Sequence, residues 1–154
     1  METPKPTDAH KRLEKLAGRW SGEEHMSPSP FDPEGGEATG RVDNRVALDG
    51  FVVVQDYEQE RGGVVAYRGH GIFTWDATRD EYVLYWFDVM GMPPSEYRGN
   101  FEGETLTLTG KTPRGHYRVV FDLGKTDGYS YKAHVSPDGR SWQTFMEGSY
   151  TREG

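Results

Sequence analysis

Hydrophobic and polar residues alternate with a period of two along most of the chain after residue 18. In one such stretch Tyr117, Val119 and Phe121 share one parity, and His116 and Arg118 share the other. This period is typical of strands with one buried face. The pattern predicts strands near residues 19–27, 38–48, 51–60, 64–75, 81–89, 95–101, 104–110, 115–123, 128–136 and 141–151.

Turn signals separate these segments at short intervals. They include Asp49-Gly50, Arg61-Gly62-Gly63, Glu102-Gly103 and Asp127-Gly128. Tight turns between consecutive strands give an antiparallel meander. A meander of about ten strands curls and closes, because closure removes the exposed edges. We therefore expect an all-β barrel whose lumen holds one small molecule.

A different periodicity precedes the strands. Thr7 and Asp8 are good N-caps, Leu13 and Leu16 share one helical face, and Gly18 is a natural stop. The sequence predicts a helix over 8–17 that is too short to be stable unless it docks on the barrel. The expected organisation is one domain over 1–154, with a flexible segment 1–7, the helix and a barrel over 18–152.

Gly18-Arg19-Trp20 follows this helix and opens the first strand. It resembles the Gly-x-Trp signature of lipocalins and other calycins. The resemblance implies that the helix closes one barrel end and that Trp20 packs beneath it. It also implies an Arg from the last strand over that Trp, and Arg152 is the basic residue there. A cation–π contact of this kind contributes on the order of 0.5–2 kcal/mol.

The chain as a whole resembles an uncharacterised bacterial family of calycin-like domains of unknown function. The matching stretches are 16–22 (LAGRWSG), 48–51 (LDGF), 69–76 (GHGIFTWD), 86–88 (WFD) and 147–150 (EGSY). This resemblance implies a fold and no established activity. The first strand and the topology are also similar to nitrobindin-type barrels, which implies haem held through a His.

Composition and charge exclude several classes of protein. The chain has no Cys, which excludes disulfides, thiolate metal sites and a Cys nucleophile. A formal charge of −7 argues against nucleic acid as a partner. The five His show no metal-binding spacing, so we expect no metal site. No apolar run approaches the roughly 20 residues of a membrane helix, and the N-terminus lacks the apolar region of a signal peptide. We therefore expect a cytoplasmic protein.

His70 is the first candidate for chemistry, because it lies between Gly69 and Gly71 within a strand. Glycine in a strand marks a bulge or the close approach of another group. The functional interpretation is an imidazole that faces a ligand, or a haem ligand. The alternative is a His that faces solvent, with glycines that relieve barrel curvature. Asp88 ends an apolar strand, either as a partly desolvated carboxylate at the barrel mouth or as a turn residue.

Aromatic residues make up 13% of the chain and supply the expected ligand wall. Candidate ligand-binding residues besides His70 and Asp88 are Phe73, Trp75, Tyr82, Trp86 and Met90. Loops near 28–36 and 90–94 are expected to frame the mouth. A topological resemblance to small fatty-acid-binding barrels adds Arg118 as a candidate for holding a ligand carboxylate.

Three functions fit these observations. The favoured one is binding of a small, largely apolar molecule in the barrel lumen. The first alternative is an enzyme that uses His70, either through haem or through acid–base chemistry with Asp88. The second is a homo-oligomeric interaction domain with a filled lumen. Binding is favoured over catalysis, and no catalytic residue is assigned.

Overall fold

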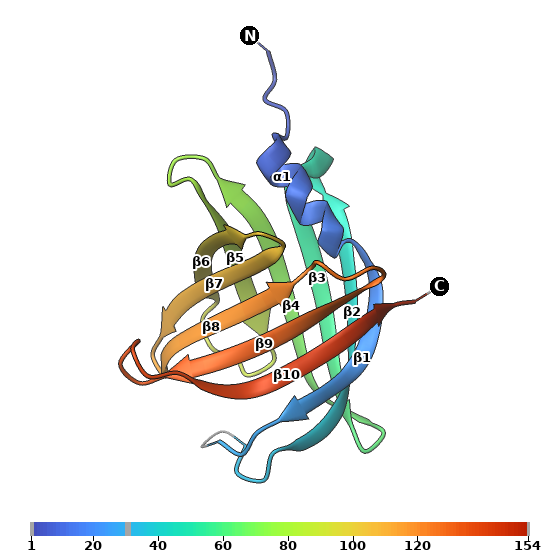
Figure 1. The fold of residues 1–154 in the computed structure, drawn as a ribbon, viewed down its shortest axis with the longest axis vertical. Helices are drawn as coiled ribbons and strands as arrows, with labels where there is room; N and C mark the ends of the chain where they lie inside the picture. The colour runs from blue at the N-terminus through green and yellow to red at the C-terminus, as the bar shows by residue number, and fades with distance from the viewer. Residues whose placement is uncertain (1, 30–31, 154) are drawn as a thin grey trace.

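A computed structural model describes residues 2–29 and 32–153 of the chain. Within these residues a short helix is followed by ten antiparallel strands (Figure 1). The strands are β1 (Gly18–Met26), β2 (Gly36–Ala47), β3 (Val52–Arg61), β4 (Val64–Asp76), β5 (Glu81–Asp88), β6 (Ser95–Glu102), β7 (Thr105–Thr112), β8 (Gly115–Asp122), β9 (Gly128–Ser136) and β10 (Gln143–Arg152). Each strand begins and ends within two residues of its predicted limits.

Every strand pairs with its neighbours in the chain, and β1 also pairs with β10, so the sheet closes into a barrel. At the closure Trp20 lies opposite Arg152 on β10 and opposite Val42 on β2. The predicted antiparallel meander and its closure are confirmed. In the described residues no helix is long and apolar enough to cross a membrane.

The N-terminal helix differs from the single α-helix predicted over 8–17. It consists of α1 (Asp8–Arg12) followed by one 3₁₀ turn, η1 (Leu13–Leu16). A 3₁₀ helix has about three residues per turn, so residues three apart align on one side. Leu13 and Leu16 are thereby both buried, with 1% and 0% exposure. The helix lies over one end of the barrel (Figure 1), and both leucines belong to the buried core.

Trp20 anchors this capped end. Its indole Nε1 donates to the Leu16 carbonyl at 2.9 Å. The Arg152 guanidinium lies 4.2 Å from the centre of the Trp20 ring, where the lipocalin resemblance implies an Arg. Arg152 Nη1 also donates to the Ala17 carbonyl at 2.8 Å, so one side chain covers the ring and binds the end of the helix.

Aromatic side chains fill the capped half of the barrel. Phe73 is 1% exposed and meets Phe121 edge to face at 5.5 Å. Tyr82 packs against Trp75 at 4.7 Å, and its hydroxyl donates to the Ala9 carbonyl at 2.7 Å. The capped half is therefore a packed core held to the helix by a hydrogen bond.

Candidate functional site: the open half of the lumen

A cavity of about 380 Å³ occupies the other half of the barrel. This volume lies near the lower end of the range of ligand pockets, about 300–1,000 Å³. Aromatic side chains dominate its wall: Tyr57, Tyr67, Trp86, Tyr97, Tyr117, Phe121, Tyr129, Tyr131, Phe145 and Tyr150 line it. The lumen is thus filled at one end and hollow at the other, which contradicts the expectation of a filled lumen attached to the interaction-domain hypothesis.

A buried carboxylate lies behind one side of this wall. Glu24 on β1 is 1% exposed and accepts hydrogen bonds at both oxygens. The Tyr57 hydroxyl lies 2.8 Å from each oxygen, Gln59 Nε2 lies 3.1 Å from Oε1, and the Tyr150 hydroxyl donates to Oε2. Burial raises the pKa of Glu24, and the hydrogen bonds from Tyr150, Tyr57 and Gln59 oppose that rise.

Two glycines make room for this cluster. A Cβ at Gly40 would lie 2.3 Å from Glu24 Oε2, and one at Gly148 would lie 2.5 Å from the Tyr150 hydroxyl. Any side chain at these positions would displace the carboxylate or the ring. Burial also raises the pKa of Tyr57 and Tyr150, so both hydroxyls keep the protons that they donate.

Other polar groups on the wall have no protein partner. Gln55 is 6% exposed and Tyr129 is 2% exposed, and both line the cavity. Among the described residues neither side chain makes a hydrogen bond, and the same holds for the Tyr131 hydroxyl. The buried side-chain atom without a partner in the described residues is Asn44 Oδ1, so the polar atoms of these three residues are open to the cavity and available to a molecule that enters it.

Ion pairs and hydrogen bonds frame the cavity mouth. Arg61 on β3 binds Asp32 in the β1–β2 loop at 2.7 Å, and this contact lowers the pKa of Asp32. Across the mouth Tyr67 donates to Asp88 at 2.7 Å, while Trp86 Nε1 donates to the Tyr67 hydroxyl at 3.0 Å. Ser27, Ser29, Asp32 and Met90 bring both predicted loops to the cavity; residues 30–31 lie outside the described part of the chain.

The candidate ligand-binding residues named from the sequence therefore lie in different parts of the barrel. Trp86, Asp88 and Met90 line the cavity. Phe73, Trp75 and Tyr82 face the barrel interior at the capped end, outside the cavity lining, so their assignment to the ligand wall is corrected. The reason is the helix, which packs Leu13 and Leu16 onto that end.

His70 lies on the outer surface of the barrel, so the lumen-facing interpretation is corrected. Its Nδ1 lies 2.7 Å from Asp56, and its side chain is 43% exposed. The flanking glycines face inward instead, and a Cβ at Gly69 would lie 2.0 Å from Trp86. The space predicted beside His70 is thus occupied by Trp86. His70 cannot bind a haem in this lumen, and none of the described lining residues is a histidine.

Arg118 also faces outward. Its guanidinium stacks on Trp142 at 4.1 Å, away from the cavity. Neighbours of opposite parity on β8, Tyr117 and Val119, face the lumen. The role that the fatty-acid-binding resemblance implies for Arg118 is therefore corrected, and the arginines that line the cavity are Arg61 and Arg114 among the described residues.

The sequence interpretation missed Glu24, Gln55, Tyr57, Gln59 and Tyr150. Parity offered a signal for Glu24, because it shares a face of the first strand with Trp20 and Met26, which are both buried. A carboxylate on the face of a buried Trp and a buried Met indicates a polar group inside the barrel.

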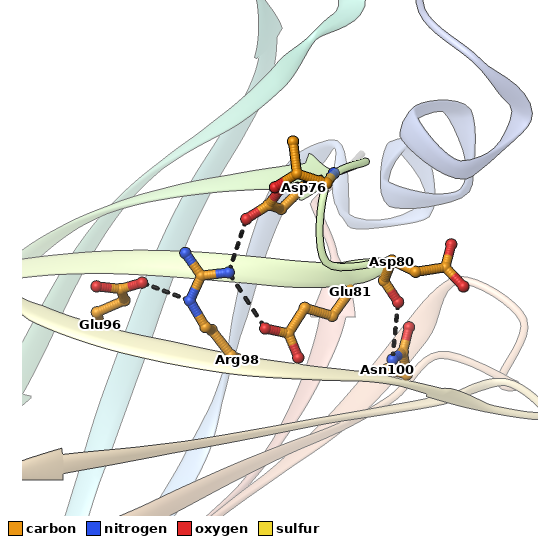
Figure 2. A network of polar contacts seen from close by, with 7 residues as sticks. Asp76, Asp80, Glu81, Glu96, Arg98 and Asn100 are labelled. Atoms are coloured by element: carbon orange, nitrogen blue, oxygen red, sulfur yellow. Dashed lines mark hydrogen bonds and ion pairs between the residues drawn. The ribbon is translucent and has the colours of Figure 1, made fainter.

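A charged cluster on the outer surface joins three strands near the capped end. Figure 2 shows Arg98 of β6 between Asp76, Glu81 and Glu96. Arg98 Nη1 donates to Asp76 at 2.9 Å and to Glu81 at 3.2 Å. Hydrogen bonds from Thr78 and Arg98 lower the pKa of Asp76 to about 2. The cluster fastens the β4–β5 turn to β6.

No described His, Asp or Glu residues form a group that could hold a metal ion.

Fold and site together define a calycin-like barrel, closed by a helix at one end and hollow at the other. The chain belongs to the family described as protein of unknown function DUF1579, which it matches over residues 5–152. No curated protein is similar enough in sequence to match the chain.

Two solved structures share the fold. Rv2717c from M. tuberculosis superposes with a TM-score of 0.70 at 16% identity, covering 96% of this chain and 99% of that one. The S-type phycobiliprotein lyase CPES from Guillardia theta gives a TM-score of 0.63 at 10% identity, covering 97% and 99%. At these identities the likeness extends to the barrel alone.

Proposed function

We propose that this protein binds a small, largely apolar molecule with aromatic or conjugated character in the open half of its lumen. The observation that carries the proposal is the 380 Å³ cavity, because its wall is aromatic and also carries polar side chains such as Gln55 and Tyr131 that are open to the cavity. Apolar walls with a few polar groups are typical of small-molecule sites. The fold of a phycobiliprotein lyase, a barrel of the same type, is consistent with this use.

The size of the cavity limits the ligand. A volume near the lower end of the pocket range fits a molecule of one to three rings better than a large macrocycle. The mouth lies between the β1–β2 loop, held by Asp32–Arg61, and the segment after β5 that contains Met90. Entry from this side requires no movement of the capping helix.

Native mass spectrometry of protein purified from its host without added ligand tests the proposal directly. We expect a discrete mass increment of one small molecule per chain. In parallel, calorimetric titration with naphthalene, a fatty acid, a retinoid, a flavin and haemin surveys the ligand classes. We expect naphthalene to bind at a ratio near one to one.

A pair of alanine substitutions locates the binding. Ala133 is 2% exposed and lines the cavity, whereas Ala66 lies exposed on β4. Ala133→Phe should weaken naphthalene binding at least tenfold, because the ring occupies ligand space. Ala66→Phe should leave it within twofold. The proposal is wrong if no mass increment is found and no probe shows saturable binding that Ala133→Phe weakens.

A further inference from the structure

The cluster around Glu24 determines which hydrogen-bonding groups the wall offers to a ligand. The hydroxyl hydrogens of Tyr57 and Tyr150 both point to the Glu24 carboxylate. The Gln59 amide nitrogen donates to Glu24 Oε1 and to the Tyr57 oxygen, each at 3.1 Å. The Gln59 nitrogen also lies 3.7 Å from Met26 Sδ, so these hydrogens are all directed to protein atoms and none is left for a ligand.

Because the donors are used within the cluster, the polar groups on this side of the lumen present oxygen lone pairs to the cavity. Tyr57, Gln59 and Tyr150 line the cavity, whereas Glu24 is not part of the lining. A hydroxyl that donates to a carboxylate becomes a stronger acceptor, because hydrogen bonds in a chain polarise one another. This part of the wall is therefore an acceptor surface, with the Glu24 carboxyl group behind it.

Residues from three strands form the recess that holds the Glu24 carboxylate. Glu24 comes from β1, while Gly40 on β2 and Gly148 on β10 leave the space that its oxygens and the Tyr150 hydroxyl occupy. Arg61, the cation that acts on Glu24, is paired with Asp32 at 2.7 Å and donates to Gln59 Oε1 at 3.3 Å. A ligand anion at the Tyr57 and Tyr150 hydroxyls would therefore meet oxygen lone pairs.

We propose that the lumen selects a ligand that presents an N–H or O–H donor to the Tyr57–Tyr150 wall, and that Glu24 acts as the positioning residue for this preference. The inference rests on the small-molecule binding proposed above and names the polar chemistry of that ligand. A neutral hydroxyl, a lactam or pyrrole N–H and an ammonium group all meet the requirement. A carboxylate does not.

Matched naphthalene probes test the proposal. The pair 2-naphthol and 2-methoxynaphthalene differs in whether the oxygen carries a hydrogen, and naphthalene itself reports the apolar contribution. We expect 2-naphthol to bind at least tenfold more tightly than 2-methoxynaphthalene to the wild-type protein, a difference of about 1.4 kcal/mol. Calorimetry at pH 7, where 2-naphthol is neutral, gives the three dissociation constants.

Glu24→Gln tests the positioning role. An amide offers one acceptor oxygen and a nitrogen that donates, so one tyrosine hydroxyl must accept from it and turn its own hydrogen toward the lumen. The preference for 2-naphthol should then fall at least tenfold, and 2-methoxynaphthalene should bind more tightly than to the wild type. A purely structural role would weaken all three probes equally. Glu23→Gln, on the exposed face of the same strand, is the matched control and should change nothing.

Tyr150→Phe provides a second test if Glu24→Gln does not fold, because it removes an acceptor and keeps the carboxylate. It should weaken 2-naphthol at least fivefold and leave 2-methoxynaphthalene within twofold. If naphthalene binds but 2-naphthol and 2-methoxynaphthalene bind equally to the wild type or respond equally to the variants, the inference is wrong and the binding function stands. If none of the three probes binds, the inference is wrong, and the proposed function fails as well if native mass spectrometry finds no bound molecule and no other probe binds.

Discussion

Gly69→Ala should destabilise the barrel because Trp86 already occupies the space above Gly69. A Cβ there would lie 2.0 Å from Trp86 Cζ2 and 2.5 Å from Cη2, whereas at Gly71 the nearest atoms lie at 3.0 Å. The indole cannot simply turn aside, because its Nε1 donates to the Tyr67 hydroxyl at 3.0 Å. The ring must move as a whole and break that hydrogen bond.

The size of the effect follows from two opposing contributions. Overpacking a core costs about 1–3 kcal/mol. Replacing glycine by alanine within a strand recovers roughly 0.5–1 kcal/mol of backbone entropy. Gly69→Ala should therefore lower the free energy of unfolding by about 1–2 kcal/mol. Gly71→Ala is the matched control on the same strand and face, and its two contributions nearly cancel, because a shift of a few tenths of an ångström relieves the contact.

Removing the ring should reverse the sign. In a Trp86→Leu background the clashing atoms are absent, so adding Gly69→Ala should stabilise the protein by roughly 0.5–1 kcal/mol. Urea unfolding followed by far-ultraviolet circular dichroism gives the four stabilities of the double-mutant cycle. A coupling energy near zero would refute the reasoning, since it would mean that Gly69 and Trp86 do not compete for one space.

Three further predictions concern the capped end, the charged cluster and His70. Arg152→Ala should lower the free energy of unfolding by about 1–2 kcal/mol, because it uncovers Trp20 and leaves a helix-end carbonyl without its donor, and thermal unfolding measures this. Asp76→Asn should destabilise the protein at pH 6, and the difference from wild type should shrink as the pH falls from 3.8 towards about 2. The sign follows because the pKa of Asp76 is lower in the folded state, so its contribution is lost as acid protonates it; unfolding by urea across this pH range would contradict the argument if the gap stayed constant. His70→Ala should change the naphthalene dissociation constant by less than twofold, because His70 binds Asp56 on the outer surface, and calorimetry on the two proteins checks this.

The strands were predictable because local chemistry sets their limits. Glycines with positive φ end several of them, as at Gly62 and Gly63 with φ of 58° and 81° between β3 and β4. Side-chain parity then fixes which residues share a face. The contact between Arg152 and Trp20 was expected from the lipocalin resemblance and not from the pattern, and the pairing of the first and last strands places the two residues opposite each other.

The candidate site was harder to predict because parity does not show how deep a residue lies. Phe73 and Trp86 both face the interior, yet Phe73 lies in the packed half and Trp86 lies at the cavity. Depth depends on the stagger between strands and on how far the helix enters, and neither is local. The glycines beside His70 show the same limit: they do signal empty space, but the side chain that fills it comes from the neighbouring strand.

The Glu24 cluster lies beside the cavity and not in the packed half of the lumen, and the energetic cost of a buried carboxylate explains this position. Burying a carboxylate among neutral donors costs free energy, and apolar replacements of buried polar groups are often neutral or stabilising. The capped half supplies the packing, because Leu13, Leu16 and Phe73 are at most 1% exposed there. The polar cluster lies instead beside the cavity, where its Tyr57 and Tyr150 hydroxyls face whatever enters. Such an arrangement is what a binding site requires, since its acceptor wall gains from being rigid while the packed half keeps the barrel folded.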